Sequence, residues 1–323
     1  MATTRRNVLA GLTGWGLAGF ALPAWGQAIG AQSDPWAQVD PYADPRNGFP
    51  SERRAIGGGA SAGDGPFRRA AESTADDQDE IAVGRMAYPS RIKRGGGAYA
   101  DAKVQQALRD FCRPLFAASD RPELPWVVTL VNTAEPNANA GAGGTVIVNG
   151  GILPLFDHPT QFAAVLAHEI GHVDYRHVTR GTDIGLLAQI ARKQGVTTNG
   201  DAAMTALMPE VQGSVKDFMD LMDKTFSRED EAEADAHVVE IFDRIGIDPA
   251  RAADGMRAIL KMEQRTGSGA PNQWVSEHPL TPDRIRHMEA LAATRRRPST
   301  DYAFAGWDVL KAAFPTHPDF RKA

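Results

Sequence analysis

The chain has 323 residues, of which 42% are hydrophobic and 23% charged. These proportions are typical of a globular protein and exclude a wholly disordered, fibrous or multi-span membrane chain. The formal net charge of −5 gives no basic excess that would favour a nucleic acid as partner. The only cysteine, Cys112, can form neither an intrachain disulfide nor a thiolate metal site, so a metal would depend on His, Asp and Glu side chains.

Residues 1–26 have the pattern of an export signal. The uncharged run from Val8 to Leu22 contains four glycines, which makes it too short and too weakly apolar to span a membrane. The Arg5-Arg6 pair ahead of it resembles a twin-arginine signal, and an ordinary secretory signal with two arginines is the alternative. Either signal would place the mature protein in the periplasm or otherwise outside the cytoplasm, with no transmembrane span.

Residues 27–80 differ in composition from the rest of the chain. Between Gly30 and Pro66 there are seven glycines and five prolines, and the acidic side chains from Glu72 to Glu80 have no balancing base. Such a segment cannot bury enough apolar surface to offset its chain entropy, so we expect a flexible leader.

Beyond residue 81, periodic apolar side chains predict helices and β-branched runs predict a small sheet. We expect Asp157 or Thr160 to cap the helix that carries Pro159 in its first turn. Cys112 is expected as inert packing on a buried helix face. The expected helices span residues 99–118, 157–179, 182–193, 201–226, 228–245, 249–266 and 282–293, and the expected strands span residues 126–132 and 145–149.

These elements predict an α+β fold that is predominantly helical. We expect one catalytic domain at residues 81–293, with the sheet beside the helix at residues 157–179. Residues 294–323 then form a C-terminal tail whose aromatic side chains either pack back on the domain or bind a partner.

The segment from His168 to His172 has the pattern HExxH and lies on the helix expected at residues 157–179. Because an α-helix turns by about 100° per residue, the two histidines share one face and can bind one ion. Glu169 then lies beside the open coordination position, as a catalytic zinc requires. A solvated helix with two satisfied histidines is the alternative interpretation.

A candidate third ligand lies on the helix expected at residues 228–245. Glu231 and Asp235 are four residues apart and therefore share a face of that helix. A His₂Glu zinc site needs one carboxylate from elsewhere, and a further acceptor to orient a ligand histidine. We expect Glu231 to be the ligand and Asp235 the orienting acceptor, although acids at a helix start also complement its dipole.

Together these motifs resemble the M48 family of zinc metallopeptidases, over about Asp79 to Leu291. The resemblance implies a zincin-like metallopeptidase fold, one Zn²⁺ per chain and peptide hydrolysis, and it is to the soluble, exported branch. Asn139 and Ala142 stand where the family commonly has an aromatic residue and a proline. Further matching segments follow the family's order at residues 81–84, 88–89, 137–140, 143–144, 149–153, 164–172, 176–177, 227–235, 246, 248–249, 278–279 and 284–285.

The same residues predict the mechanism. A zinc ion held by His168, His172 and Glu231 would activate water and polarise the scissile carbonyl. Glu169 would act first as general base and then as general acid. We expect polypeptide substrates to bind as an added strand along the edge from Asn137 and Ala138 to Val148, through main-chain hydrogen bonds.

Two further histidines extend the prediction. His278 lies in a Ser-Glu-His-Pro-Leu turn, and we expect it near the metal, either as a fourth ligand that holds the site closed or as a transition-state donor. A loop histidine that caps the next helix is the alternative. His177, next to Arg176, is expected to be a charge partner of the helix C-terminus rather than a ligand.

The expected function is that of an exported zinc metalloendopeptidase acting on unfolded or misassembled envelope proteins. Envelope proteins are the expected partners, and no nucleic acid is expected. The two alternatives are a peptide-binding, chaperone-like module with little turnover and a zinc hydrolase of a non-peptide substrate. The intact Glu169 argues against the first, and the edge strand that begins at Asn137 argues against the second.

Overall fold

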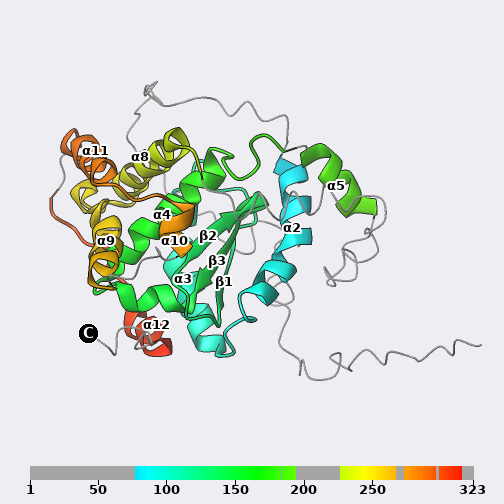
Figure 1. The fold of residues 1–323 in the computed structure, drawn as a ribbon, viewed down its shortest axis with the longest axis horizontal. Helices are drawn as coiled ribbons and strands as arrows, with labels where there is room; N and C mark the ends of the chain where they lie inside the picture. Colours follow the sequence, from blue (N-terminus) through cyan, green and yellow to red (C-terminus); the bar gives the residue numbers. More distant parts are fainter. Residues whose placement is uncertain (1–76, 183, 194–225, 267–272, 296–297, 315–323) are drawn as a thin grey trace, which may run out of the picture. The chain divides into compact units, whose positions relative to one another are not determined.

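The computed structural model describes residues 77–182, 184–193, 226–266, 273–295 and 298–314, drawn as coloured ribbon in Figure 1. The expected signal segment, nearly all of the expected leader and nearly all of the helix expected at residues 201–226 lie outside the described residues. Within the described part of the chain, no helix has both the length and the apolar character needed to cross a membrane.

The described chain is mostly helical, with one small sheet, as expected. The helices at residues 228–245 and 282–293 are confirmed to the residue, whereas the predictions for residues 99–118 and 157–179 were too long. The first helix and the two shortest ones were not predicted. The helices are α2 (Asp77–Arg94), α3 (Ala102–Ala117), α4 (Pro159–Asp174), α5 (Ile184–Lys193), α8 (Arg228–Ile245), α9 (Asp254–Thr266), α10 (Gln273–Glu277), α11 (Pro282–Ala293) and α12 (Trp307–Ala313), with short 3₁₀ segments at Ala142–Gly144, Gly150–Leu155 and Pro249–Arg251.

The sheet has three strands in the order β1–β3–β2. Strand β3 (Thr145–Asn149) is central, parallel to β1 (Val127–Val131) and antiparallel to β2 (Ala138–Gly141). The two strands with β-branched sequences are confirmed. The sequence of β2, Ala-Asn-Ala-Gly, lacks β-branched and aromatic residues, so it gave no strand signal of that kind.

The sheet is covered on both faces, which explains why every residue of β1 and β3 is buried. Side chains alternate between the faces of a strand. Val127 and Val131 pack with Tyr88 of α2 on one face, and Val128 and Leu130 join the main core with α3 and α4 on the other. Figure 1 shows α2 on the opposite side of the sheet from α3 and α4.

Helix α4 is the central element, because every one of its residues except Gln161 is buried. His158 caps the N-terminus of this helix. Its Nδ1 accepts a hydrogen bond from the Thr160 amide at 3.2 Å. The prediction that Asp157 or Thr160 caps this helix was therefore wrong, because an imidazole nitrogen takes the place of the expected side-chain oxygen. Pro159 occupies the first turn as expected.

Helices α4 and α8 approach each other closely at Gly171. A Cβ atom at this position would lie 3.0 Å from the Cα of Ala234 and 3.2 Å from the Cβ of His237. The glycine inside the HExxH segment thus lets the second helix lie directly against the first. Helix α8 itself has a capping box of Ser227 and Asp230 and ends at Gly246, whose φ of 79° is left-handed.

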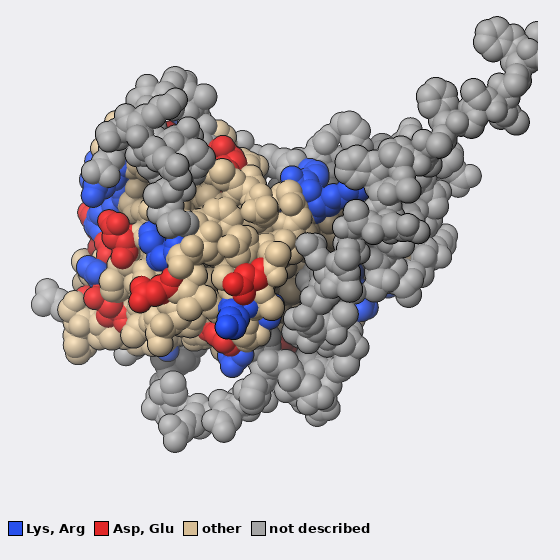
Figure 2. Space-filling view, turned by 90° about the horizontal axis from the view of Figure 1, so that it is seen from below, with Lys and Arg blue, Asp and Glu red and all other residues tan. Residues whose placement is uncertain are grey.

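The described part of the tail packs on the domain, which was one of the two expected outcomes. Tyr302 and Leu310 are buried in the main core. Lys311 donates hydrogen bonds to the carbonyl oxygens of Leu153 and Phe156, at 3.2 and 2.7 Å. On the face shown in Figure 2, acidic and basic side chains are interspersed among other residues and form no patch of a single sign.

Candidate metal centre

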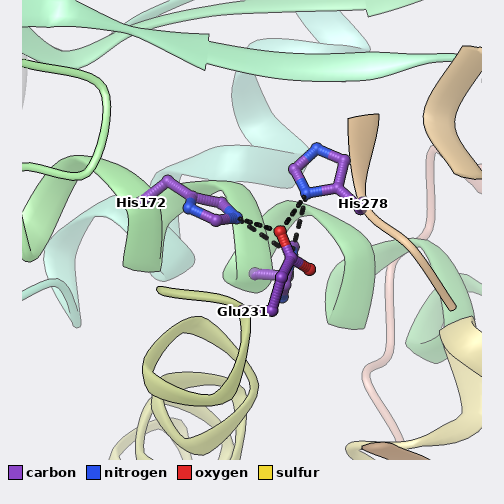
Figure 3. A group of neighbouring side chains, drawn as sticks. His172, Glu231 and His278 are labelled. Atoms are coloured by element: carbon purple, nitrogen blue, oxygen red, sulfur yellow. Dashed lines mark hydrogen bonds and ion pairs between the residues drawn. The ribbon is translucent and has the colours of Figure 1, made fainter. Parts of the chain in front are cut away.

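Four side chains from three segments meet between α4 and α8. His168 and His172 lie one turn apart on α4, Glu231 lies in the first turn of α8, and His278 follows α10 directly. Figure 3 shows His172 and His278 pointing toward the carboxylate of Glu231. All three histidines are fully buried, and Glu231 is 2% exposed. The structure therefore brings together the three expected ligands and the expected fourth residue.

The ligand atoms lie at the separations that a tetrahedral metal site requires. His168 Nε2 lies 3.1 Å from His172 Nε2 and 3.3 Å from His278 Nδ1. Oxygens of Glu231 lie 3.4 Å from His168 Nε2, 3.6 Å from His172 Nε2 and 3.0 Å from His278 Nδ1. Bonds of about 2.0–2.1 Å to a tetrahedral ion separate its ligands by roughly 3.3 Å. One ion therefore fits between these four side chains.

The chemistry of the donor atoms also favours a cation. Imidazole nitrogens and a carboxylate present lone pairs, and here they are directed at one another in a site with almost no solvent contact. Protons can bridge individual pairs of these atoms, but a single cation satisfies all of them at once. The donor set of three nitrogens and one oxygen suits a divalent transition-metal ion.

The pKa values reflect the charge of this centre. Burial lowers the pKa of His168, but its hydrogen bonds to Asp235 and Glu231 outweigh burial and raise the pKa to about 9. Burial and the neighbouring His168 hold the pKa of His172 well below its usual range. Burial raises the pKa of Glu231, but His278 and His168 outweigh it and hold the pKa far below its usual range. The positively charged neighbours of Glu231 thus favour its ionised form.

Asp235 lies where the sequence had placed the orienting acceptor. Its Oδ1 is 3.1 Å from His168 Nδ1, on the side of the ring opposite the ligand atom. Arg284 of α11 donates to both oxygens of Asp235, at 2.7 and 2.8 Å, and its guanidinium also lies 2.6 Å from Glu231 Oε2. The sequence pattern of the family includes Arg284 but indicates no role for it. The need to neutralise two buried carboxylates would have pointed to a cation of this kind.

Glu169 lies between the four-residue centre and strand β2. Its Oε2 accepts a hydrogen bond from the Ala140 amide at 3.1 Å, and its Oε1 accepts one from Trp274 Nε1 at 3.3 Å. The ring of Trp274 stacks on His278 with centroids 4.8 Å apart. Sequence reasoning missed Trp274, because a tryptophan in a five-residue helix carries no motif.

The edge strand is shorter than the segment from Asn137 to Val148 that the sequence predicts as the substrate edge. Asn137 directs its side-chain amide to both carboxylate oxygens of Glu277, at 3.1 and 3.2 Å. Ala138 begins β2, which is the edge strand, whereas Val148 lies in the central strand β3. Burial raises the pKa of Glu277, although Asn137 and Gln273 oppose the shift.

Two other groups of histidine and acid lie near the centre in the described chain. One contains His177, Asp230 and Glu233, and the other, here called the His237 cluster, contains His237, Asp174, Glu240 and Asp120. Each already contains an arginine. Arg180 pairs with Asp230, and Arg244 lies 2.7 Å from Asp120 and 3.2 Å from Glu240. Each of these groups thus offers a single histidine and two or more acids, whereas the metal centre offers three histidines and one acid.

The fold and this centre define a class of protein. A buried HExxH helix, a glutamate from a second helix and an adjacent small sheet are the features of a zincin-like metallopeptidase domain. Residues 101–292, more than half of the chain, match the family model of peptidase family M48. The chain therefore belongs to peptidase family M48, as its motifs had indicated.

Several relatives with known names are similar to the chain. The beta-barrel assembly-enhancing protease of Escherichia coli (strain K12) is 26% identical over 226 residues, which are 67% of this chain and 44% of that protein. Metalloprotease LoiP of the same strain is 28% identical over 152 residues, 47% of this chain and 57% of the relative. The mitochondrial metalloendopeptidase OMA1 of Schizosaccharomyces pombe is 28% identical over 208 residues, 63% of this chain and 58% of the relative. The chain spans about half the length of the curated relatives it matches.

Proposed function

We propose that this protein is an exported, zinc-dependent metalloendopeptidase that cleaves unfolded or misassembled proteins of the cell envelope. The observation that carries the proposal is the meeting of His168, His172 and Glu231 with a fourth residue, His278, around a space that fits one ion. The glutamate expected as general base lies beside this group. The names of the relatives, which describe proteases and in one case beta-barrel assembly, support the class of substrate.

Zinc is the metal we propose, because a tetrahedral set of histidine nitrogens with one carboxylate suits it. When bound, it would polarise the scissile carbonyl and lower the pKa of a water molecule. His168, His172 and Glu231 would hold it. Asp235 would fix the orientation of the His168 ring, and Arg284 would keep the two carboxylates ionised and in place.

Glu169 would move the proton. Two donors, the Ala140 amide and Trp274 Nε1, orient its carboxylate, one at each oxygen. From that position it would accept a proton from the attacking water and pass it to the leaving amine. The general base and the edge strand are thus connected by a hydrogen bond.

Strand β2 supports the proposed mode of substrate binding. The Asn149 amide donates to the Asn137 carbonyl, so Asn137 directs its main chain toward β3. Because successive residues of an antiparallel strand direct their main-chain groups to opposite sides, those of Ala138 and Ala140 face away from β3. The Ala140 amide does point to Glu169. A peptide added to this edge would place its main chain beside the general base.

His278 would hold the centre closed in the state described here. Its Nδ1 completes the group of four ligand atoms, and Trp274 stacks on its other side. A peptide would then have to displace His278 before hydrolysis. Activity of His278→Ala tests this role, since a rise supports a closing ligand, a fall supports a transition-state donor, and no change excludes both.

A peptide-binding module with little turnover is the second candidate, and the burial of the whole centre is the observation that favours it. Metal analysis and casein cleavage by the mature protein, beside Glu169→Gln, separate the two candidates. We expect one zinc per chain in both proteins and cleavage in the unsubstituted protein alone. Zinc without cleavage of any unfolded substrate by either protein would favour the second candidate.

The proposed location is outside the cytoplasm, by way of a twin-arginine signal. The Arg5-Arg6 pair and the segment that follows it support this part of the proposal. Fractionation of cells that express the full chain tests it, with Arg5→Lys and Arg6→Lys together as the variant. Loss of export in the variant is expected, and unchanged export would indicate an ordinary secretory signal.

A further inference from the structure

The chain takes an unusual turn directly after α4. Arg176 has a φ of 57° and is the only residue other than glycine with a positive φ in the described part of the chain. This left-handed conformation is unfavourable for an L-residue, because its Cβ comes too close to the following carbonyl oxygen. The turn lets the His177 amide donate to the His172 carbonyl at 2.9 Å, which brings the side chain of His177 back toward the metal centre.

Side chains of α2 hold Arg176 in this conformation. The guanidinium of Arg176 pairs with Glu80 and lies 2.6 Å from Asp77, both in the first turn of α2. Thr179 Oγ1 donates to the same Glu80 at 3.0 Å, and the guanidinium of Arg121 lies 2.6 Å from Glu80 Oε2. Strain that the surroundings maintain in this way is characteristic of functional sites.

The turn places His177 between a proposed ligand and a buried acid. His177 Nδ1 lies 2.9 Å from His172 Nδ1, and His177 Nε2 lies 2.9 Å from Glu233 Oε2. The side chain of His177 has no exposed surface, and that of Glu233 is 9% exposed. The rings of His172 and His177 therefore each have a partner at both nitrogens, since His172 Nε2 lies 3.1 Å from His168 Nε2.

The pattern of donors along this row follows from the chemistry of each group. If His172 gives its Nε2 lone pair to a metal, its Nδ1 carries the hydrogen and donates to His177 Nδ1. His177 must then carry its own hydrogen on Nε2, where the carboxylate of Glu233 accepts it. We propose that His177 and Glu233 form a positioning relay that fixes the tautomer and ring orientation of the metal ligand His172.

This proposal rests on the proposed zinc site, and it explains a difference between the two histidines of HExxH. His168 has a carboxylate, Asp235, directly beside its second nitrogen. Among the residues that the structure describes, His172 has no carboxylate at that nitrogen and reaches one through His177. A carboxylate partner makes a histidine a stronger ligand. Both ligands would thus be supported by α8, one directly and the other through an intermediate imidazole.

A second metal ion at His177, Asp230 and Glu233 is a weaker interpretation of the same contacts. This group offers three ligand atoms with one histidine among them, whereas the metal centre offers four with three histidines. His177 also directs one nitrogen at another imidazole rather than at the acids. The group therefore suits a chain of hydrogen bonds better than a second ion.

The test measures zinc affinity rather than proteolysis, by competition with a chromophoric chelator. The variants are Glu233→Gln, His177→Phe and the double variant, with Glu229→Gln as the matched control. Glu229 lies one turn before Glu233 on α8, is exposed, and loses the same charge when substituted. We expect each relay variant to bind zinc about 10–100-fold more weakly and the control to bind it as the unsubstituted protein does.

The double variant distinguishes a relay from two independent effects. If Glu233 acts only through His177, the double variant loses no more affinity than His177→Phe alone. Losses that multiply, or a zinc affinity unchanged in either single variant, would overturn the proposal. Glu233→Gln keeps the volume and an acceptor oxygen, so it remains informative if His177→Phe does not fold.

An absorption spectrum of the cobalt-substituted protein distinguishes a role in orienting His172 from a general effect on the stability of the fold. Cobalt(II) in place of zinc gives absorption bands that report the ligand geometry. We expect these bands to shift in Glu233→Gln and to stay unchanged in Glu229→Gln. A lower thermal stability of the metal-free variants with unchanged bands and affinity would mean that the two residues are merely structural. If proteolysis is absent while these shifts occur, the proposed activity fails but the relay stands.

Discussion

The metal centre and the His237 cluster take most of their side chains from the same two helices, α4 and α8, and both combine histidine with acidic side chains. In the metal centre the ligand atoms face one another across a common space. In the His237 cluster each atom has a partner of its own, since His237 Nε2 lies 2.7 Å from Asp174 and its Nδ1 lies 3.4 Å from the Tyr175 hydroxyl. A buried histidine beside acids is thus not sufficient evidence of a metal site, and the metal centre differs in having four buried residues that present ligand atoms to one space.

Removal of a metal ligand should distinguish the metal centre from the His237 cluster most strongly. We expect His172→Ala to weaken zinc binding by about a hundredfold or more and to abolish proteolysis, because one of the four ligand atoms is lost. His237→Gln, on the facing helix, should keep the zinc stoichiometry. Metal analysis after dialysis and casein cleavage measure both effects. Equal loss of zinc in the two variants would mean that the His237 cluster also binds metal.

Loss of the arginine that serves the metal centre should be the next largest effect. Arg284→Met leaves Asp235 and Glu231 buried without their cation, and we expect a loss of about 3–5 kcal/mol in the free energy of unfolding. Arg286→Met is the control on the same helix, since its side chain is 68% exposed and its pair with Asp283 contributes about 1 kcal/mol at most. Urea denaturation of metal-free and zinc-loaded protein measures the losses.

Saturating zinc should reduce the effect of Arg284→Met, because the ion supplies positive charge beside Glu231. The same loss with and without zinc would argue against a cation site at this carboxylate.

The His237 cluster should show its own dependence on pH. Burial lowers the pKa of His237, but hydrogen bonds to Asp174 and Glu240 outweigh it and raise the pKa to about 9. Because the folded pKa exceeds the unfolded one of about 6.5, the stabilisation is complete below pH 6.5 and is lost as the pH rises through 9. Against His237→Gln, we expect an advantage of up to about 3 kcal/mol at pH 6 that disappears by pH 10.

Urea denaturation of the metal-free proteins at several pH values measures this difference without the pH dependence of metal binding. Glu240, whose pKa falls to about 2 in spite of burial because of its hydrogen bond to His237, should remain ionised across this range. An advantage that is independent of pH would show that His237 is neutral in the folded protein.

The smallest expected effect tests the contact between the helices that carry both regions. Gly171→Ala places a methyl group 3.0 Å from the Cα of Ala234, and we expect a net loss of about 1 kcal/mol. Overpacking costs about 1–3 kcal/mol, and the higher helix propensity of alanine returns about 1 kcal/mol. Thermal unfolding measures the loss. Ala163→Gly, at a buried position of the same helix, is a control that lacks the overpacking, and stabilisation by Gly171→Ala would show that α8 can move outward.

Patterns among neighbouring residues were sufficient to predict many of the helices and strands. The boundaries of α8 follow from Ser227 and Asp230 at its start and Gly246 at its end, all of which act within one turn. The start of α4 was misjudged because a histidine caps it, and histidine is not among the common capping residues. The edge strand β2 gave no β-branched signal because its small residues are held in place by neighbours rather than by local preference.

The sequence by itself determined which side chains share a helix face. The spacing of four residues places His168 with His172 and Glu231 with Asp235, whatever the rest of the chain does, because helix geometry is local. Composition alone also excluded thiolate ligands. These facts are properties of neighbouring residues and need no knowledge of packing.

Only the tertiary structure decided which faces meet. Arg284, Trp274 and the pair His177–Glu233 reach the centre from other elements or around a strained turn, and no spacing along the chain records that. The same holds for His237, whose partner Asp174 is 63 residues away. The physical reason is that long-range contacts depend on how α4, α8, α10 and α11 pack, with Gly171 permitting the close approach on which the metal centre depends.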